Sequence, residues 1–266
     1  MIIKFWGVQG SYPYVSVDKK SFHTPCVSIE TEEALIVFDG GSGLSVLDLY
    51  YKTTHKPVYL FLSHFHFDHI SGLLSFSKLF VDDASIILVH PNPNQVKAML
   101  DSLFNTPFFP LSRDSLRCSI DIQTPEQLSF ASCQIECHEL KHTGKAYAYK
   151  LSVGDKSVVY ATDNELDRTN KSSFFEFIKK STVLIHDAHF YKEDRDKYKG
   201  WGHSFVDDVC AFSDEAMVEQ LVLFHHNPKR SVDSYRELKK YISKTAKSSK
   251  FLASIELSYD GMEIDF

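Results

Sequence analysis

The chain has 266 residues, a formal net charge of −6 and 43% hydrophobic residues, which suits a single globular domain over residues 1–266 with a sizeable core. The acidic balance argues against a nucleic-acid footprint, because such surfaces are usually basic, although a local site can still attract small anions. No apolar run approaches the roughly 20 residues of a membrane segment, and the sequence begins without a signal-peptide pattern, so we expect a cytoplasmic protein.

The first half of the sequence alternates short strands with helices. Runs rich in β-branched and aromatic residues predict strands at 1–8, 25–32, 34–41, 57–64 and 85–91. Helices are predicted at 42–52, with Ser42 as the N-cap, at 68–80 and at 94–104. Residues 105–130, which contain Pro107, Pro110 and Pro125, are expected to be irregular.

The second half repeats this alternation. Strands are predicted at 133–140, 146–153, 157–163, 182–190, 220–226 and 251–257, with a hairpin turn at Gly154-Asp155. Helices are predicted at 172–180, at 204–217 with Ser204 as the N-cap, and at 231–247. Hairpins with interspersed helices indicate an α/β protein in which two sheets pack face to face under helices.

Residues 64–69, with the sequence HFHFDH, form a dense cluster of metal-binding side chains directly after a buried strand. Imidazole nitrogens and carboxylate oxygens together suit zinc, iron or manganese, and the lack of cysteine disfavours a structural thiolate site. The alternative is a surface turn that happens to be rich in histidine. Against it, His142, Asp163 and His225 also lie at the ends of later predicted strands. Strand alternation favours His225 over His226 as a ligand, because His225 shares a face with Leu221 and Leu223.

The order His-x-His-x-Asp-His, then a lone His, an Asp and a lone His closely resembles the metallo-β-lactamase superfamily. The sequence FDGGSG around Asp39 resembles the early Asp-x-Gly loop of that superfamily, which lies beneath the metals. The resemblance implies a four-layer αββα sandwich with a two-metal site. It assigns His64, His66 and His142 to one metal, Asp68, His69 and His225 to the other, and Asp163 as the bridge.

One functional interpretation is a metal-dependent phosphodiesterase. The sequences KFWGVQGSYP, GWGHS and LFHHNP resemble a branch that includes cyclic-nucleotide phosphodiesterase-like and tRNA-processing hydrolases. In that case His203 would steady the phosphate or protonate the leaving oxygen. His203 could instead be a capping residue beside Ser204.

The interpretation we prefer from the sequence is an oxygen-binding di-iron sensor. The chain looks like the stand-alone di-iron proteins coupled to chemotaxis receptors, which are related to flavo-diiron proteins. His90 ends the strand after the metal-binding turn and could bind iron or a peroxide there. One of His186, His189 and Tyr191 could reach the same pocket. His226 could support the ligand beside it. Iron is therefore favoured for the two metal ions, with zinc or manganese as alternatives.

The sequence departs from the flavo-diiron pattern in two ways. Flavo-diiron proteins usually carry Glu where this chain has His66, so the turn itself is hydrolase-like. The sequence also shows no flavodoxin-like domain to supply electrons, so bound iron is expected to form a stable adduct for sensing and not to turn over repeatedly. The expected ligand is dioxygen or a small anion. A sensor would signal to a chemotaxis receptor–kinase complex, through a homodimer contact or the loop at residues 191–202.

Overall fold

The computed structural model describes residues 1–16, 20–107, 109–166 and 171–266. These residues form two compact units, and each unit combines separate stretches of the chain. The first unit comprises Met1–Gly7, Tyr12–Ser132 and Asp260–Asp265, and the second comprises Val8–Ser11, Cys133–Tyr259 and Phe266. The expectation of one domain over residues 1–266 stays a prediction.

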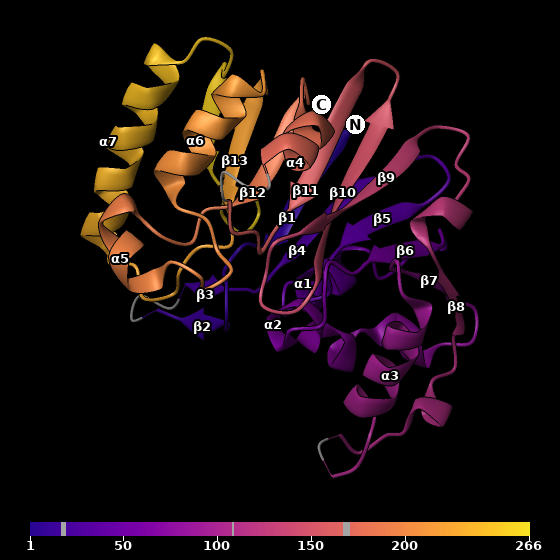
Figure 1. Cartoon of the computed structure of the whole chain (residues 1–266). Coiled ribbons are helices and arrows are strands. Elements are labelled where there is room, and N and C mark those ends of the chain that lie inside the picture. Colours follow the sequence, from indigo (N-terminus) through magenta and orange to yellow (C-terminus); the bar gives the residue numbers. More distant parts are fainter. Residues whose placement is uncertain (17–19, 108, 167–170) are drawn as a thin grey trace. The chain divides into compact units, whose positions relative to one another are not determined.

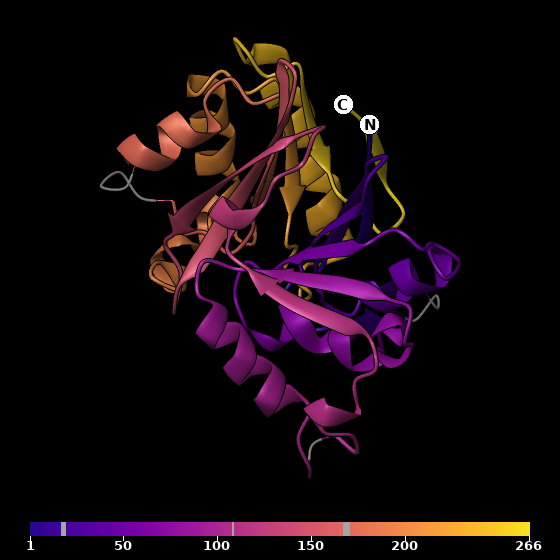
Figure 2. The ribbon, with the colours of Figure 1, turned by 90° about the vertical axis from the view of Figure 1, so that its right-hand side faces the viewer.

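The first unit is built on a mixed seven-stranded sheet. Its strands, in sheet order, are β15 (Glu263–Asp265), β1 (Ile2–Gly7), β4 (Cys26–Glu30), β5 (Leu35–Phe38), β6 (Val58–Phe61), β7 (Ser85–Val89) and β8 (Ser119–Gln123). Strands β5 to β8 are parallel neighbours, and the other pairs are antiparallel. Because β15 pairs with β1, strands from the two ends of the sequence lie side by side (Figure 2).

Helices cover the first sheet with apolar side chains. They are α1 (Leu44–Tyr50), α2 (Phe67–Ile70) and α3 (Pro93–Leu103), and a small ribbon pairs β2 (Tyr14–Val15) with β3 (Ser21–Phe22). Leu47 of α1 and Leu100 of α3 belong to the same buried cluster as Leu60 of β6 and Leu88 of β7. The helices thus fix the end of β6, after which the turn with residues 64–69 begins.

Three local predictions in the first unit were wrong. The segment 68–80 is not one helix. Helix α2 ends at Ile70 and two short 3₁₀ segments follow, because the Gly72 N–H donates to the Gly40 carbonyl at 2.9 Å and not to a carbonyl of the preceding helical turn. Ser42 does not cap α1, since its hydroxyl accepts from the Thr24 N–H instead. The stretch 105–130 contains an ordered strand, β8, paired with β7.

The second unit is built on a mixed six-stranded sheet. Its strands, in sheet order, are β14 (Ser254–Leu257), β13 (Gln220–Phe224), β12 (Val183–Asp187), β11 (Lys156–Ala161), β10 (Ala146–Val153) and β9 (Gln134–Leu140). Its helices are α4 (Lys171–Ile178), α5 (Arg195–Tyr198), α6 (Val206–Glu215) and α7 (Val232–Ser248). Helices α4, α6 and α7 pack on one face of this sheet (Figure 1). The hairpin at Gly154-Asp155 is confirmed, because Val153 pairs with Lys156 across it.

Ser204 is not the N-cap of α6. The helix begins after Phe205, which makes no side-chain cap. The Ser204 hydroxyl instead donates to the Asn164 carbonyl and accepts from the Leu166 N–H, so it ties two loops together. The interpretation of His203 as a helix-capping neighbour therefore loses its basis.

Both units are α/β, with a mixed sheet and helices packed on it. Parallel neighbours direct their C-terminal ends to the same sheet edge, where ligands of α/β proteins usually bind. In the first unit that edge leads to Asp39, His64 and His90, and in the second to Asp163, Asp187 and His225. Among the described residues, no helix is both long enough and apolar enough to span a membrane.

Candidate metal centre

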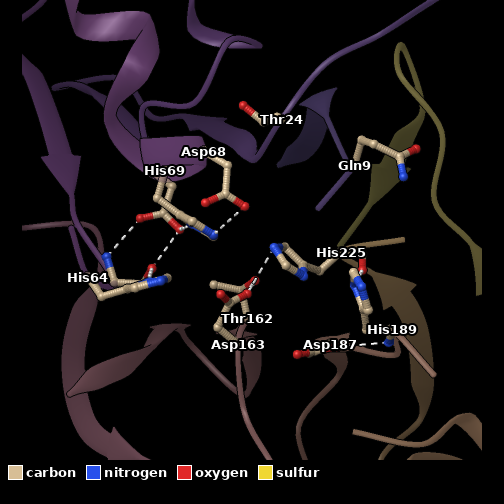
Figure 3. Close-up of polar contacts among 12 residues, drawn as sticks. Gln9, Thr24, His64, Asp68, His69, Thr162, Asp163, Asp187, His189 and His225 are labelled. Atoms are coloured by element: carbon tan, nitrogen blue, oxygen red, sulfur yellow. Dashed lines mark hydrogen bonds and ion pairs between the residues drawn. The ribbon is translucent and has the colours of Figure 1, made fainter. Parts of the chain in front are cut away.

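A turn of the first unit gathers histidines and an aspartate after β6. His66 immediately precedes α2, and Asp68 and His69 lie within that helix. The ring centroids of His64 and His66 lie 4.5 Å apart, and those of His64 and His69 lie 4.3 Å apart. The Nε2 atom of His69 lies 3.5 Å from an Asp68 carboxylate oxygen (Figure 3). The structure thus brings these predicted ligands together.

The buried carboxylate of Asp39 orients two of these histidines. It accepts hydrogen bonds of 2.7 Å from Nδ1 of His69 and from both the backbone N–H and the hydroxyl of Ser63. The Ser63 oxygen lies 3.0 Å from Nδ1 of His64. Because the Ser63 hydroxyl donates to Asp39, it accepts from His64, so both rings carry their proton on Nδ1. Each ring therefore presents Nε2 as its metal-binding atom.

His90 lies directly after β7, where its ring centroid is 4.6 Å from that of Phe65. Its Nδ1 accepts a hydrogen bond of 3.0 Å from the Asn92 N–H, and burial lowers the pKa of its imidazole to about 4. Across the described residues, His90 belongs to none of the groups whose metal-binding atoms lie within 4.8 Å of one another. Its expected role at an oxygen adduct stays a prediction.

The second unit gathers predicted ligands around one buried carboxylate. Nε2 of His225 lies 3.0 Å from Oδ1 of Asp163 (Figure 3), and Nε2 of His142 lies 3.5 Å from Oδ2. Nδ1 of His142 donates to the Gly202 carbonyl at 2.8 Å, which fixes the orientation of that ring. With an imidazole facing each of its oxygens, Asp163 is well placed to act as a shared ligand.

The His225 ring is fixed by close packing and by an unusual backbone conformation. Strand β13 ends just before this residue, and His225 has φ of +56°, so strand alternation does not extend to it. A Cβ at Gly10 would lie 2.6 Å from the ring, so only glycine leaves it room. Asp39 and Asp163 also have positive φ, of +58° and +49°. Strained backbone of this kind clusters at functional sites.

Asp187, for which the sequence pattern indicated no role, contacts further histidines of the second unit. It is fully buried at the end of β12 and accepts from Nδ1 of His203 at 2.7 Å and from the His189 N–H at 2.9 Å. The ring centroid of His203 lies 4.5 Å from that of His189 and 5.1 Å from that of His225. Donor atoms of Asp163, Asp187, His203 and His225 lie within 4.8 Å of one another. The sequence signal that could have identified Asp187 is an aspartate at the end of a predicted strand, the same signal that identified Asp163.

The charges in this group are set by burial and by proximity. Burial, together with the neighbouring His203 and His225, lowers the pKa of His189 to about 3, so this imidazole is neutral at pH 7. Burial alone would raise the pKa of the Asp187 carboxyl, but the adjacent His203 holds it below its ordinary value. A buried anionic carboxylate therefore faces the partly exposed imidazole of His203.

Tyr191 and His226 make their own contacts in the second unit. The Tyr191 hydroxyl donates to the Ser234 carbonyl of α7 at 3.1 Å, and the Arg230 guanidinium lies over its ring. The structure therefore does not bring Tyr191 into the histidine group. His226 is buried and donates from Nε2 to the Ser258 carbonyl at 3.0 Å. It supports the backbone next to His225, whose own ring faces Asp163.

The donor chemistry of both units fits divalent metal ions. Imidazole and carboxylate donors without thiolates suit zinc, iron and manganese alike. The imidazoles of His64, His69 and His142 are each held through Nδ1, an arrangement typical of metal-binding histidines. The two families of donors, one in each unit, are those that the sequence pattern predicted.

Comparison with known proteins agrees with this chemistry. The family model described as a beta-lactamase superfamily domain matches residues 36–226. A ribonuclease Z from Pyrococcus horikoshii is 23% identical over an alignment of 270 positions, and this alignment covers 81% of this chain and 84% of the relative.

Solved structures show the same fold. The metallo-beta-lactamase fold protein YhfI from Bacillus subtilis has a TM-score of 0.73 at 19% identity and covers 99% of both chains. A diphosphatase from the PhnP family has a TM-score of 0.72 at 16% identity, covering 100% of this chain and 97% of its own. With the family model spanning well over half of its length, this chain belongs to the metallo-β-lactamase superfamily.

Proposed function

We propose that the protein is a metal-dependent phosphodiesterase, the hydrolase alternative that the sequence left open. The observation that carries this proposal is the pair of His203 and Asp187. An imidazole that is 15% exposed donates from Nδ1 to a fully buried carboxylate at 2.7 Å. A histidine held in this way has a fixed orientation and tautomer, as a general acid or a phosphate-binding residue requires.

We propose that the predicted ligands bind divalent metal ions, two of them according to the superfamily resemblance. The proposed ligands are His64, His66, Asp68, His69, His142, Asp163 and His225. When bound, the ions would supply Lewis acidity and an activated water for attack on phosphorus. The donor set accepts zinc, manganese or iron, so metal availability decides which ion is bound, and we propose to test zinc and manganese first.

His203 and Asp187 would have separate roles in the reaction. His203 would hold a non-bridging phosphate oxygen or give its proton to the leaving oxygen. Asp187 would stabilise the protonated imidazole of His203 and keep its Nε2 directed outward. Because Asp187 also accepts from the His189 N–H, the loop after β12 is held in the same position. His203 thus acts on the substrate, and Asp187 positions it.

The comparisons favour this proposal over the oxygen-binding interpretation that we preferred from the sequence. The relatives and neighbours are named ribonuclease Z and PhnP-family diphosphatase, which are hydrolases. The oxygen-binding interpretation depended on His90, whose ring packs on Phe65. Iron, chemotaxis signalling and a homodimer were tied to that interpretation, and they stay predictions.

The net charge of −6 favours a small phosphodiester over a large folded RNA as the substrate. An extended RNA would need a basic surface to neutralise many phosphates. A small phosphodiester needs only the local positive charge of the metals and of His203. We therefore propose a substrate of nucleotide size.

The test is hydrolysis of adenosine 2′,3′-cyclic phosphate, whose leaving alkoxide oxygen needs a proton, by protein loaded with zinc or manganese. His203→Ala should lower kcat by about 10²–10⁴-fold while the bound metal per chain is unchanged. His138→Ala is the matched control, since this imidazole of the same unit stacks on Phe174 and Phe177. Full activity in His203→Ala would refute the role assigned to the His203–Asp187 pair.

A second experiment separates the two functions. Metal-free protein is loaded with ferrous iron without air, and oxygen is then admitted while the visible spectrum is recorded. A stable charge-transfer band that disappears when oxygen is removed, and that weakens in His90→Ala, would restore the oxygen-binding interpretation. Hydrolysis that is unchanged in His90→Ala, without such a band, supports the phosphodiesterase.

A further inference from the structure

Trp201 is a large aromatic side chain that the fold leaves exposed. Its side chain is 59% exposed, whereas Trp6, the other tryptophan of the chain, is 8% exposed. Exposing an indole gives up the stabilisation that burial of its apolar surface would provide. An exposed indole next to functional groups is therefore a candidate binding surface.

The loop that carries Trp201 is held firmly on both sides of the indole. The N–H groups of Gly200 and Gly202 both donate to the Glu165 carboxylate, each at 2.9 Å. Glu165 is itself buried, and its N–H donates to the Lys141 carbonyl at 2.7 Å. Both glycines have positive φ, of +86° and +83°, which allows the tight turn. The indole is thus mounted on an ordered support.

The same loop is part of the proposed catalytic region. The Gly202 carbonyl accepts from Nδ1 of His142, a predicted metal ligand, and the next residue is His203. An aromatic row connects Trp201 to His203 across the second unit. Trp201 lies 5.2 Å from Tyr198, Tyr198 stacks on Phe190 at 4.5 Å, and Phe190 lies 5.8 Å from His203, all between ring centroids.

Two lysines accompany this row, with the acidic residue Asp196 exposed beside them. Lys197 and Lys199 are exposed on either side of Tyr198, and Nζ of Lys197 lies 4.8 Å from the centre of the Tyr198 ring. Aromatic side chains interleaved with cations are typical of surfaces that stack bases and attract phosphates. Residues 192–199 carry four basic and three acidic side chains, so this segment is close to neutral, whereas the whole chain has a net charge of −6.

We propose that Trp201 forms a stacking subsite for an aromatic group of the substrate, specifically the base of a nucleotide phosphodiester. The proposal rests on the phosphodiesterase function and names its substrate class. With the phosphate held at His203 and the metals, the base would lie on the exposed indole. Nucleobases stack on such a ring with little preference for sequence, so the subsite would favour nucleotides in general over phosphodiesters without a base.

The first test measures binding directly and needs no turnover. Zinc-loaded protein is titrated with adenosine monophosphate and with ribose 5-phosphate, while tryptophan fluorescence is recorded. The nucleotide should quench the emission of Trp201, and the sugar phosphate should leave it unchanged. Trp201→Ala should lose the quenching, because the indole that stacks on the base is gone. The emission that remains comes from the buried Trp6 and should not change with the nucleotide. Equal quenching in Trp201→Ala would overturn the proposal.

The second test measures specificity. The kcat/KM for adenosine 2′,3′-cyclic phosphate is divided by that for glycerol 1,2-cyclic phosphate, which has no base. In Trp201→Ala this ratio should fall by about fivefold or more, the lower end of the stacking contribution per base. Trp201→Phe should restore most of it. Phe251→Ala, which removes another exposed aromatic ring of the second unit, should not change the ratio.

These outcomes separate the subsite from the enzyme. If both substrates are hydrolysed and the ratio is the same in Trp201→Ala as in the original protein, the stacking subsite is refuted and the phosphodiesterase stands. If neither substrate is hydrolysed but only the nucleotide quenches Trp201, the subsite stands and the proposed reaction is wrong.

Discussion

Replacing Asp39 with asparagine should weaken metal binding by the first unit without removing any ligand. As a carboxylate, Asp39 only accepts, and it serves three donors: Nδ1 of His69 and the N–H and hydroxyl of Ser63. An asparagine amide must direct its NH₂ group either toward His69 or toward Ser63. An NH₂ group that faces His69 would favour the His69 tautomer with the proton on Nε2, and a protonated Nε2 cannot bind a metal. An NH₂ group that faces the Ser63 N–H would set two donors against each other.

The magnitude follows from these bonds. Loss of a group that orients a metal-binding histidine typically lowers metal affinity by about 10–100-fold. One buried donor left without its acceptor costs about 1–3 kcal/mol of folding free energy. We therefore expect Asp39→Asn to show both effects, with the loss of stability also present in metal-free protein.

The control is Asp48→Asn in the same unit. Asp48 is also buried and accepts from the N–H and hydroxyl of Ser77, at 2.9 and 3.0 Å, but its bonds involve no histidine. Metal affinity is measured by competition with a chromophoric chelator, and the His69 tautomer by long-range ¹H–¹⁵N NMR. The reasoning fails if Asp39→Asn binds metal as tightly as the original protein, or if Asp48→Asn weakens binding equally.

Two further predictions concern the second unit. Gly202→Ala should lower the metal content of the protein, because the new Cβ would lie 2.4 Å from Nδ1 of His142. Gly200→Ala is the control, since Gly200 has a similar positive φ but open space around it, and this variant should bind as much metal as the original protein. Metal analysis of both variants tests this prediction. Asp214→Asn should lower the free energy of unfolding at pH 7: although burial alone would raise the pKa of the Asp214 carboxyl, N–H donors of residues 250–252 hold it below its ordinary value. A carboxyl whose pKa is lowered in the folded protein stabilises the fold at pH values above its pKa in the unfolded chain, which is about 4 for Asp. The difference in free energy of unfolding between the two proteins should therefore shrink as the pH falls below about 4. A constant difference in urea unfolding from pH 3 to 7 would contradict this.

The sequence by itself determined the local chemistry of this protein. Residues 64–69 place several ligands in one turn, so their proximity needs only the geometry of a strand end and a short helix. The predicted strands before His64, Asp163 and His225 formed because their β-branched and aromatic residues suit a buried sheet. Local patterns failed where a long-range contact intervened, as at Ser42 and Ser204, whose hydroxyls bond to other loops instead of capping helices.

Only the tertiary structure decided which groups orient the ligands. Asp187 accepts a hydrogen bond from His203, and Gly10 packs against the His225 ring. The Ser63 hydroxyl bonds to both Asp39 and His64. Strand alternation indicates none of these contacts. The side-chain direction of a residue just past a strand end depends on its own φ and on its packing against residues distant in sequence. Periodicity along the chain carries no information about either, so the sequence could name the metal-binding residue types but not the contacts that hold them.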